Sequence, residues 1–319
     1  MPEASSTLPS LLHALLERDP PRAKSLSVTL LGDAIGPHGG SIWLSDLIEL
    51  VTPLGINERL LRTSVFRLVA QDWLQSERHG RRSLYRLSAS GLALTQGASE
   101  RIYSGPREDW DGHWTLVVLP RFGNSSLDGR GQLRRELIWA GFAAIAPGVF
   151  ALPRNHAARA RKVLDKLGVQ DKALILDASD LGADQESSLA GLVPQCWDLD
   201  EVAQHYRNFS ATFAPLLRAA GRDAPPDLAF ALRALTLHEW RRIVLHDPQL
   251  PAQMLPADWP GLAARELCGE LYWTVFDRAE EHLIAVISRD PSHYRELDPR
   301  VYQRFAGHSP AAVRGLASA

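Results

Sequence analysis

The first hundred residues alternate apolar and polar positions in a way that predicts three helices, a short strand and a hairpin. Apolar residues recur at helical steps over 26–35, and a glycine-rich segment, 36–40, ends that helix. An apolar strand over 41–44 leads into a second helix, and the turn 53–55 separates it from a third helix, for which Asn57 is a suitable N-cap. This order of elements, followed by a two-stranded hairpin, is typical of a winged helix-turn-helix.

The third helix, over residues 57–73, carries two stripes with different chemistry. The apolar stripe, which should face the core, comprises Leu61, Val65, Leu68, Val69 and Trp73. The outer stripe has the same spacing and comprises Arg59, Arg62, Thr63, Phe66 and Arg67. Arginine can bridge guanine O6 and N7 or a phosphate, and the apolar groups can meet a thymine methyl, so the outer stripe suits a DNA major groove. The alternative is a merely solvated helix face, since arginines often line exposed helices.

The hairpin that follows reads SERHGRRSLYRLS over residues 76–88, with Gly80 available for a turn of positive φ. As a wing it would place basic side chains near backbone phosphates, and its candidate contacts are Arg78, His79, Arg81, Arg82 and Tyr85. Residues 58–86 hold seven arginines against three acidic residues, a net charge of +4 in a chain whose total is −2. A basic patch on an acidic body indicates that one module meets a polyanion.

The remainder of the chain predicts two further domains. Residues 105–190 alternate strands and helices in the order βαββαβ, which is the ferredoxin-like arrangement. Residues 191–319 are almost entirely helical in pattern, and residues 1–22 form an N-terminal tail with about two helical turns before a proline pair. With the winged helix over 23–104, the fold class is therefore α+β and multidomain.

Four segments together resemble the PaaX-type regulators, the repressors of phenylacetate-degradation genes. They are RLVAQDWLQSERHGRRSLYRLSASGLAL at 67–94, WDGHWTLVVLP at 110–120, LRRELIWAGFAAIAPGVFALP at 133–153 and HEWRRIVLHDPQLPAQMLPADWPG at 238–261. The resemblance implies a Cas2-like fold for the middle domain. Nuclease relatives of that fold would carry an acidic, metal-binding residue after the first strand, but here the strand ends Leu119-Pro120-Arg121. We therefore expect dimerisation or packing, rather than nuclease chemistry, from this domain.

The resemblance also implies an effector, an aryl-acetyl coenzyme A thioester such as phenylacetyl-CoA. The candidate residues for holding it are His238, Arg241, Arg242 and Trp259, because arginines can bind its phosphates and an aromatic surface its ring. The alternative is that these charges tie their helix to the neighbouring proline-rich loop through internal ion pairs. A zinc-protease reading of His238-Glu239 fails, since the H-E-x-x-H motif needs a second histidine where Arg242 stands.

Several classes of function are disfavoured by what the sequence lacks. Cys196 and Cys268 are far apart and form no C-x-x-C pattern, so we predict neither a disulfide scaffold nor a metal site. No phosphate-binding glycine loop or nucleophile elbow occurs, and we expect no cofactor and no enzymatic activity. No apolar run is long enough to cross a membrane and no signal peptide is recognisable, so we expect a cytoplasmic protein.

Together with the resemblance to the PaaX-type regulators, the sequence thus predicts a homodimeric repressor that binds double-stranded DNA at a near-palindromic operator; the resemblance implies that it leaves the operator when an acyl-CoA binds. Two alternatives stay open. One is a regulator of a different acyl-CoA-linked pathway, and the other is an enzyme of nucleic-acid or acyl-CoA metabolism.

Overall fold

The computed structural model describes residues 7–105, 110–119, 127–179 and 188–307, with side chains described from residue 131 in the third range. The chain divides into two compact units, neither of which is one continuous stretch of sequence. The first unit comprises residues 1–105, 206–242 and 260–319, and the second comprises 106–205 and 243–259.

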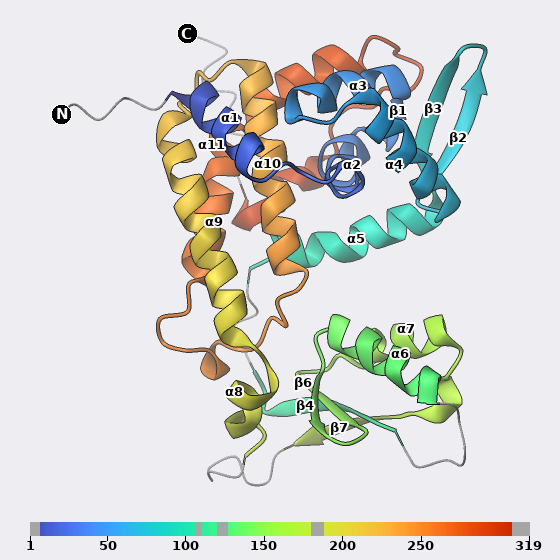
Figure 1. The fold of residues 1–319 in the computed structure, drawn as a ribbon, viewed down its shortest axis with the longest axis vertical. Coiled ribbons are helices and arrows are strands. Elements are labelled where there is room, and N and C mark those ends of the chain that lie inside the picture. Colours follow the sequence, from blue (N-terminus) through green and yellow to red (C-terminus); the bar gives the residue numbers. More distant parts are fainter. Residues whose placement is uncertain (1–6, 106–109, 120–126, 180–187, 308–319) are drawn as a thin grey trace, which may run out of the picture. The chain divides into compact units, whose positions relative to one another are not determined.

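The first unit begins with the elements predicted for a winged helix-turn-helix (Figure 1). They are α2 (Ala23–Leu30), β1 (Ser41–Trp43), α3 (Leu44–Val51), α4 (Glu58–Ala70), β2 (Leu74–His79) and β3 (Arg82–Leu87), followed by α5 (Ala89–Tyr103). The three strands form one antiparallel sheet in the order β1-β3-β2. Leu26, Leu47 and Leu61 are fully buried, so one leucine from each helix contributes to a shared core beside this sheet.

The segment predicted as an N-terminal tail contains a longer helix than expected. Helix α1 spans Leu8–Arg18, three turns, and its apolar residues Leu8, Leu12 and Leu15 are all buried. These positions lie four and three residues apart, so they share one face of the helix. Residues 8–18 therefore belong to the first unit as a packed element, a difference from the predicted tail that follows from this apolar face.

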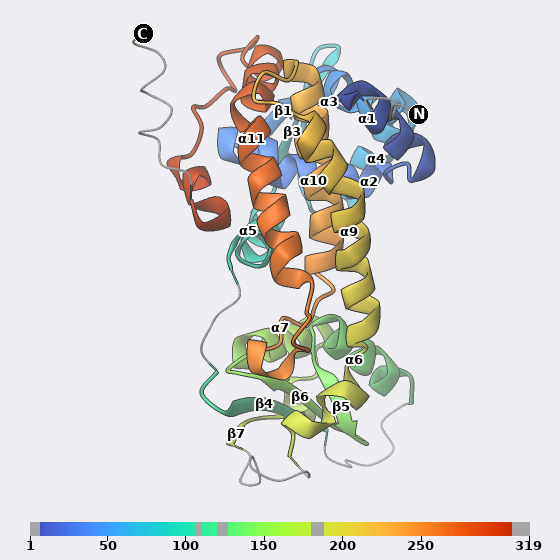
Figure 2. The same cartoon turned by 90° about the vertical axis from the view of Figure 1, so that its left-hand side faces the viewer.

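Helices from the far end of the sequence complete the first unit. They are α10 (Pro226–Val244), α11 (Gly261–Ile287) and most of α9 (Leu199–Ala219), followed by the short helix η7 (Pro299–Ala306). Figure 2 shows α9, α10 and α11 side by side. The ring of Trp240 on α10 lies 5.8 Å from that of Tyr206 and 5.6 Å from that of Phe209, both on α9. Trp240 also donates from its indole N–H to the backbone oxygen of Ile102 on α5 at 2.9 Å, so these helices are tied to the N-terminal elements and do not form the separate domain predicted for 191–319.

The second unit is built on a βαββαβ repeat. Its elements are β4 (His113–Val118), α6 (Leu127–Trp139), β5 (Ala143–Ala146), β6 (Val149–Pro153), α7 (Ala157–Leu167) and β7 (Leu174–Ser179). The strands form a four-stranded antiparallel sheet in the order β5-β6-β4-β7, which is the ferredoxin-like topology that the sequence predicted. Pro120 and Arg121, on which the prediction about nuclease chemistry rests, lie outside the described residues.

The core of the second unit also recruits the proline-punctuated loop after α10. Leu250 is buried in the same cluster as Trp114, Phe142 and Phe150, and Leu255 and Trp259 pack against it. The large apolar side chains of this loop therefore assign it to the second unit, although in the sequence it stands between α10 and α11. Among the helices of the described ranges, none combines the length and the apolar character that crossing a membrane requires.

Candidate nucleic-acid interface

Helix α4 presents the two faces predicted from its sequence. Its N-cap is Asn57, whose side chain accepts a hydrogen bond of 2.9 Å from the backbone N–H of Leu60. Leu61, Val65 and Leu68 are fully buried, whereas the predicted contact residues of the outer stripe are all exposed: Arg59, Arg62, Thr63, Phe66 and Arg67. The ring of Phe66 is 74 % exposed, which is unusual for a large apolar side chain on a helix that could have buried it.

Two of the three arginines on this outer stripe have no side-chain partner among the described residues. Arg62 pairs with Glu58 one turn earlier, at 2.7 Å, but within the described residues neither Arg59 nor Arg67 forms an ion pair. Leu60, at 50 % exposure, adds a second apolar side chain that the sequence analysis missed. Its position directly before buried Leu61 was the available signal, since adjacent residues on a helix point about 100° apart. The face thus combines unpaired guanidinium groups with exposed apolar groups.

The hairpin β2–β3 has the turn that its glycine predicted. His79 pairs with Arg82 in the register, so Gly80 and Arg81 form a two-residue turn in which Gly80 has φ +60°. Arg78 and His79, two of the predicted contact residues, are the last residues of β2. Arg78 donates from Nε to the carbonyl oxygen of Gly80 at 3.2 Å, and Arg81 at the tip has no side-chain partner among the described residues.

The other candidate residues of the hairpin are engaged within the protein. The guanidinium carbon of Arg82 lies 3.9 Å from the ring centroid of Trp43, and its Nη1 lies 3.8 Å from Oδ2 of Asp290. His79 contacts Glu77 at 2.8 Å. Tyr85 is half-buried on the central strand, where it pairs with both outer strands. Among the predicted phosphate contacts, Arg78 and Arg81 are therefore the more available ones.

Three of the four residues predicted to hold an effector lie on α10, and two of these are engaged within the first unit. His238 is 2 % exposed, and its Nδ1 lies 3.3 Å from the hydroxyl of Thr29 on α2. Arg241 donates to the same hydroxyl at 3.1 Å and to the backbone oxygen of Ser25 at 3.1 Å. Arg242 pairs with Glu239 at 2.8 Å, and Trp259 belongs to the second unit. His238 and Arg241 thus tie α10 to α2, not to the proline-rich loop as the alternative interpretation had it.

The burial of His238 changes its protonation. Desolvation, reinforced by the positive charges of Arg241 and Arg242, lowers the pKa of His238 to about 3. The imidazole is therefore neutral at physiological pH and offers no positive charge to an anionic ligand.

Three family models match consecutive parts of the chain. The model described as PaaX-like protein matches residues 22–91, the PaaX protein central Cas2-like domain matches 107–190, and the PaaX-like protein C-terminal domain matches 197–285. The Transcriptional repressor PaaX of Escherichia coli (strain K12) is 36 % identical over 308 residues, which cover 95 % of this chain and 96 % of that protein. The chain belongs to the PaaX family. Among solved structures, an uncharacterized protein from Mycobacterium tuberculosis matches 75 % of this chain and 90 % of its own, with 26 % identity and a TM-score of 0.47.

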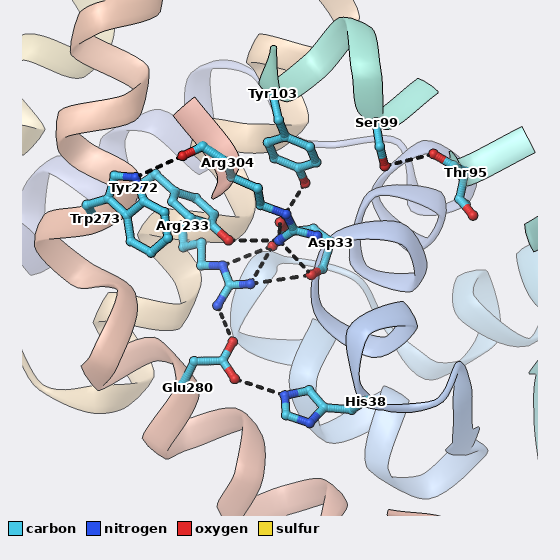
Figure 3. A network of polar contacts seen from close by, with 10 residues as sticks. All are labelled: Asp33, His38, Thr95, Ser99, Tyr103, Arg233, Tyr272, Trp273, Glu280 and Arg304. Carbon is cyan, nitrogen blue, oxygen red and sulfur yellow. Dashed lines mark hydrogen bonds and ion pairs between the residues drawn. The ribbon is translucent and has the colours of Figure 1, made fainter. Parts of the chain in front are cut away.

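A buried ionic network, which the sequence analysis did not foresee, lies inside the first unit of this PaaX-family protein (Figure 3). Arg233 on α10 donates to Asp33 at 2.9 Å and to Glu280 on α11 at 2.5 Å. Glu280 in turn contacts Nε2 of His38 at 2.9 Å. Arg304 of η7 donates to Asp33 at 2.8 Å, so that one buried carboxylate receives two guanidinium groups.

Within this network, neighbouring groups keep the carboxylate of Glu280 ionised. Burial alone would raise the pKa of Glu280, but Arg233 and His38 lower it to about 2. A signal for this network was present in the sequence, because Arg233 interrupts the apolar run LAFALRALTL and Asp33 interrupts LLGDAI. The network joins the segment that follows α2 to the helices α10 and α11, and so connects the part of the chain that matches the PaaX-like protein model with part of the region that matches the C-terminal domain model.

Proposed function

We propose that this protein is a transcriptional repressor that binds double-stranded DNA through α4 and the hairpin β2–β3. The observation that carries this proposal is the outer face of α4, where Arg59 and Arg67 are exposed, have no acidic partner among the described residues, and share the face with the exposed side chain of Phe66. The name of the relative from Escherichia coli, a transcriptional repressor, supports it over nearly the full length of the chain.

In this proposal α4 is the recognition helix of a winged helix-turn-helix. The helix would enter the major groove, where its arginines can reach guanine edges or phosphates and Thr63 and Phe66 can meet thymine methyl groups. The hairpin would act as the wing, with Arg78, Arg81 and Arg82 at the phosphate backbone and with His79 and Tyr85 behind them. Two copies of the chain would bind a near-palindromic operator as a homodimer. A repressor must reach the chromosome, which in a bacterium lies in the cytoplasm. We therefore propose that the protein acts in the cytoplasm.

We further propose that an aryl-acetyl-CoA, with phenylacetyl-CoA as the first candidate, releases the protein from its operator in a phenylacetate-degradation operon. Thermodynamic linkage requires the form that binds DNA to bind this ligand less well than the free form does. If His238 and Arg241 take part, the ligand must replace their present bonds to Thr29 and Ser25, so that its binding would separate α10 from α2. Arg242, whose side chain is 51 % exposed, could reach CoA phosphates without such a rearrangement.

The proposal is tested by selecting duplexes from a random-sequence pool with the full-length protein and measuring their affinity by fluorescence anisotropy. We expect an enriched, near-palindromic sequence that binds at least about a thousandfold more tightly than random DNA. Recovery of no enriched sequence would reject the DNA-binding function. A panel of CoA thioesters is then added to the complex: release by phenylacetyl-CoA supports the phenylacetate assignment, release by another thioester favours a different pathway, and release by none removes the effector.

A further inference from the structure

The segment that follows α11, residues 288–298, lies against the proposed DNA-binding elements, and we refer to it as the C-terminal strap. The backbone N–H of Asp298 donates to the carbonyl oxygen of Pro37 at 3.0 Å, and the carbonyl oxygen of Arg295 lies 2.8 Å from Nδ1 of His38. Arg289 pairs with Glu49 on α3 through two hydrogen bonds of 2.6 and 2.8 Å. The C-terminal strap is therefore attached at several points along its length to the part of the chain that matches the PaaX-like protein model. The strap itself lies outside that matched part.

Within the C-terminal strap, Asp290 lies beside Trp43, the last residue of β1, and beside Arg82, which directly follows the turn of the hairpin. Its Oδ2 accepts a hydrogen bond of 3.1 Å from the indole N–H of Trp43 on β1, and its Oδ1 accepts one of 2.5 Å from the hydroxyl of Ser292. Hydrogen bonds from Ser292 hold the pKa of Asp290 below its usual range, so this carboxylate is ionised at neutral pH. The same Oδ2 lies 3.8 Å from Nη1 of Arg82, the first residue of β3.

Arg82 makes a stacking contact and a long ion pair within the described part of the chain. Its guanidinium group packs on the face of Trp43, with the carbon 3.9 Å from the ring centroid. At 3.8 Å the contact with Asp290 is too long for a hydrogen bond, so the attraction between them is Coulombic. Among the described residues no acceptor takes a hydrogen bond from the Arg82 side chain, which is 53 % exposed. Arg82 is thus held in a defined orientation with its donors still available.

A phosphate group that approached Arg82 would meet the negative charge of Asp290 at the same place. We propose that Asp290 limits the affinity of the wing for DNA by competing with backbone phosphates for Arg82, while Trp43 holds the arginine in position. The inference rests on the proposed DNA-binding function and adds to it a competing carboxylate from outside the proposed DNA-binding segment. Because Asp290 lies three residues beyond the end of α11, at Ile287, it also links the wing to the C-terminal helices.

The test removes the negative charge of residue 290 and keeps its hydrogen bond with the indole of Trp43. Asp290→Asn retains an oxygen acceptor for the indole, so we expect the affinity for the selected duplex at low salt to rise about two- to fivefold, the range expected for one exposed ion pair. Asp290→Glu keeps the charge and should stay near the wild-type affinity. In an Arg82→Ala background, Asp290→Asn should have no effect, because the group for which the carboxylate competes is gone.

Matched controls separate the competition from a structural role of the C-terminal strap. Glu49→Gln removes an acidic charge that holds the strap but does not touch Arg82, and it should not raise the affinity. Circular dichroism checks that each variant is folded, and Asp290→Ser replaces Asp290→Asn if the latter is not. An unchanged or lower affinity of the charge-removing variant overturns the inference, as does a rise that persists without Arg82. If the wild-type protein itself selects no duplex, the proposed function fails, which is a distinct outcome.

Discussion

Two groups of arginines in the first unit have opposite surroundings. Arg233 and Arg304 are buried, and both donate to Asp33. Arg59 and Arg67 on α4 are exposed and have no acidic partner among the described residues. A buried guanidinium group without a carboxylate would be strongly destabilising, whereas an exposed one costs little because water solvates it. The buried arginines therefore determine the fold, and the exposed arginines are free to bind an anion.

The difference between the two groups is tested by replacing one arginine of each group and comparing the free energies of unfolding. Arg233→Met preserves much of the buried volume but leaves Asp33 and Glu280 short of a positive charge, so we expect a loss of about 3 to 5 kcal/mol in the free energy of unfolding. Arg67→Ala, the matched exposed change, should stay within about 0.5 kcal/mol of the wild type. Urea denaturation followed by circular dichroism measures both. Equal losses would mean that the exposed face of α4 is also structural.

The second prediction concerns protonation in the buried region. The pKa of His238 is about 3 in the folded protein and 6.5 in the reference state, so below pH 6.5 the unfolded chain binds a proton that the folded chain does not. The free energy of unfolding should then decrease on acidification by up to about 1.4 kcal/mol per pH unit from this residue. We expect the decrease between pH 6.5 and pH 4.5 to be smaller in His238→Gln, measured by urea denaturation at each pH.

Between pH 4.5 and 6.5, Glu280 should not contribute to the change in the free energy of unfolding with pH. Its pKa falls from 4.5 to about 2 on folding, so its stabilising contribution is complete above pH 4.5 and is lost between pH 4.5 and 2. Parallel pH profiles for the wild type and His238→Gln would show that His238 is protonated in the folded protein, contrary to its burial.

The two regions also differ in how far the sequence predicts them. The stripes of α4 and the βαββαβ order follow from local periodicity, because residues three or four apart on a helix, or two apart on a strand, share a face. The buried network does not, since Arg233 and Asp33 are 200 residues apart and the fold alone brings them together. For the same reason the sequence placed residues 206–242 and 260–319 in a separate domain, whereas they belong to the first unit together with residues 1–105.

The exposed region gives the third prediction. Arg59 lies in the first turn of α4, the part of a recognition helix that usually reaches base edges. We expect Arg59→Ala to lower the affinity for the selected duplex by about 1 to 3 kcal/mol and to relax the preference at one base position. Arg242→Ala, which removes a half-exposed arginine of α10, is the control and should leave DNA binding unchanged. A loss that is the same for every sequence would assign Arg59 to phosphate instead.

The smallest expected effect belongs to the tip of the wing. Arg81 extends from the turn without a partner among the described residues, so a phosphate contact there should contribute affinity but no sequence preference. Arg81→Ala should weaken binding to the selected duplex and to random DNA by the same factor and reduce the slope of log affinity against log salt by about one, since one fewer counterion is released. Titrations at several salt concentrations measure this slope, with Arg161→Ala on the exposed surface of α7 as the control. An unchanged slope would place the tip of the wing outside the interface. Because Arg82, one residue later, is stacked on Trp43 beside Asp290, its replacement would also disturb the intramolecular contact, and Arg81 is the cleaner test of the wing.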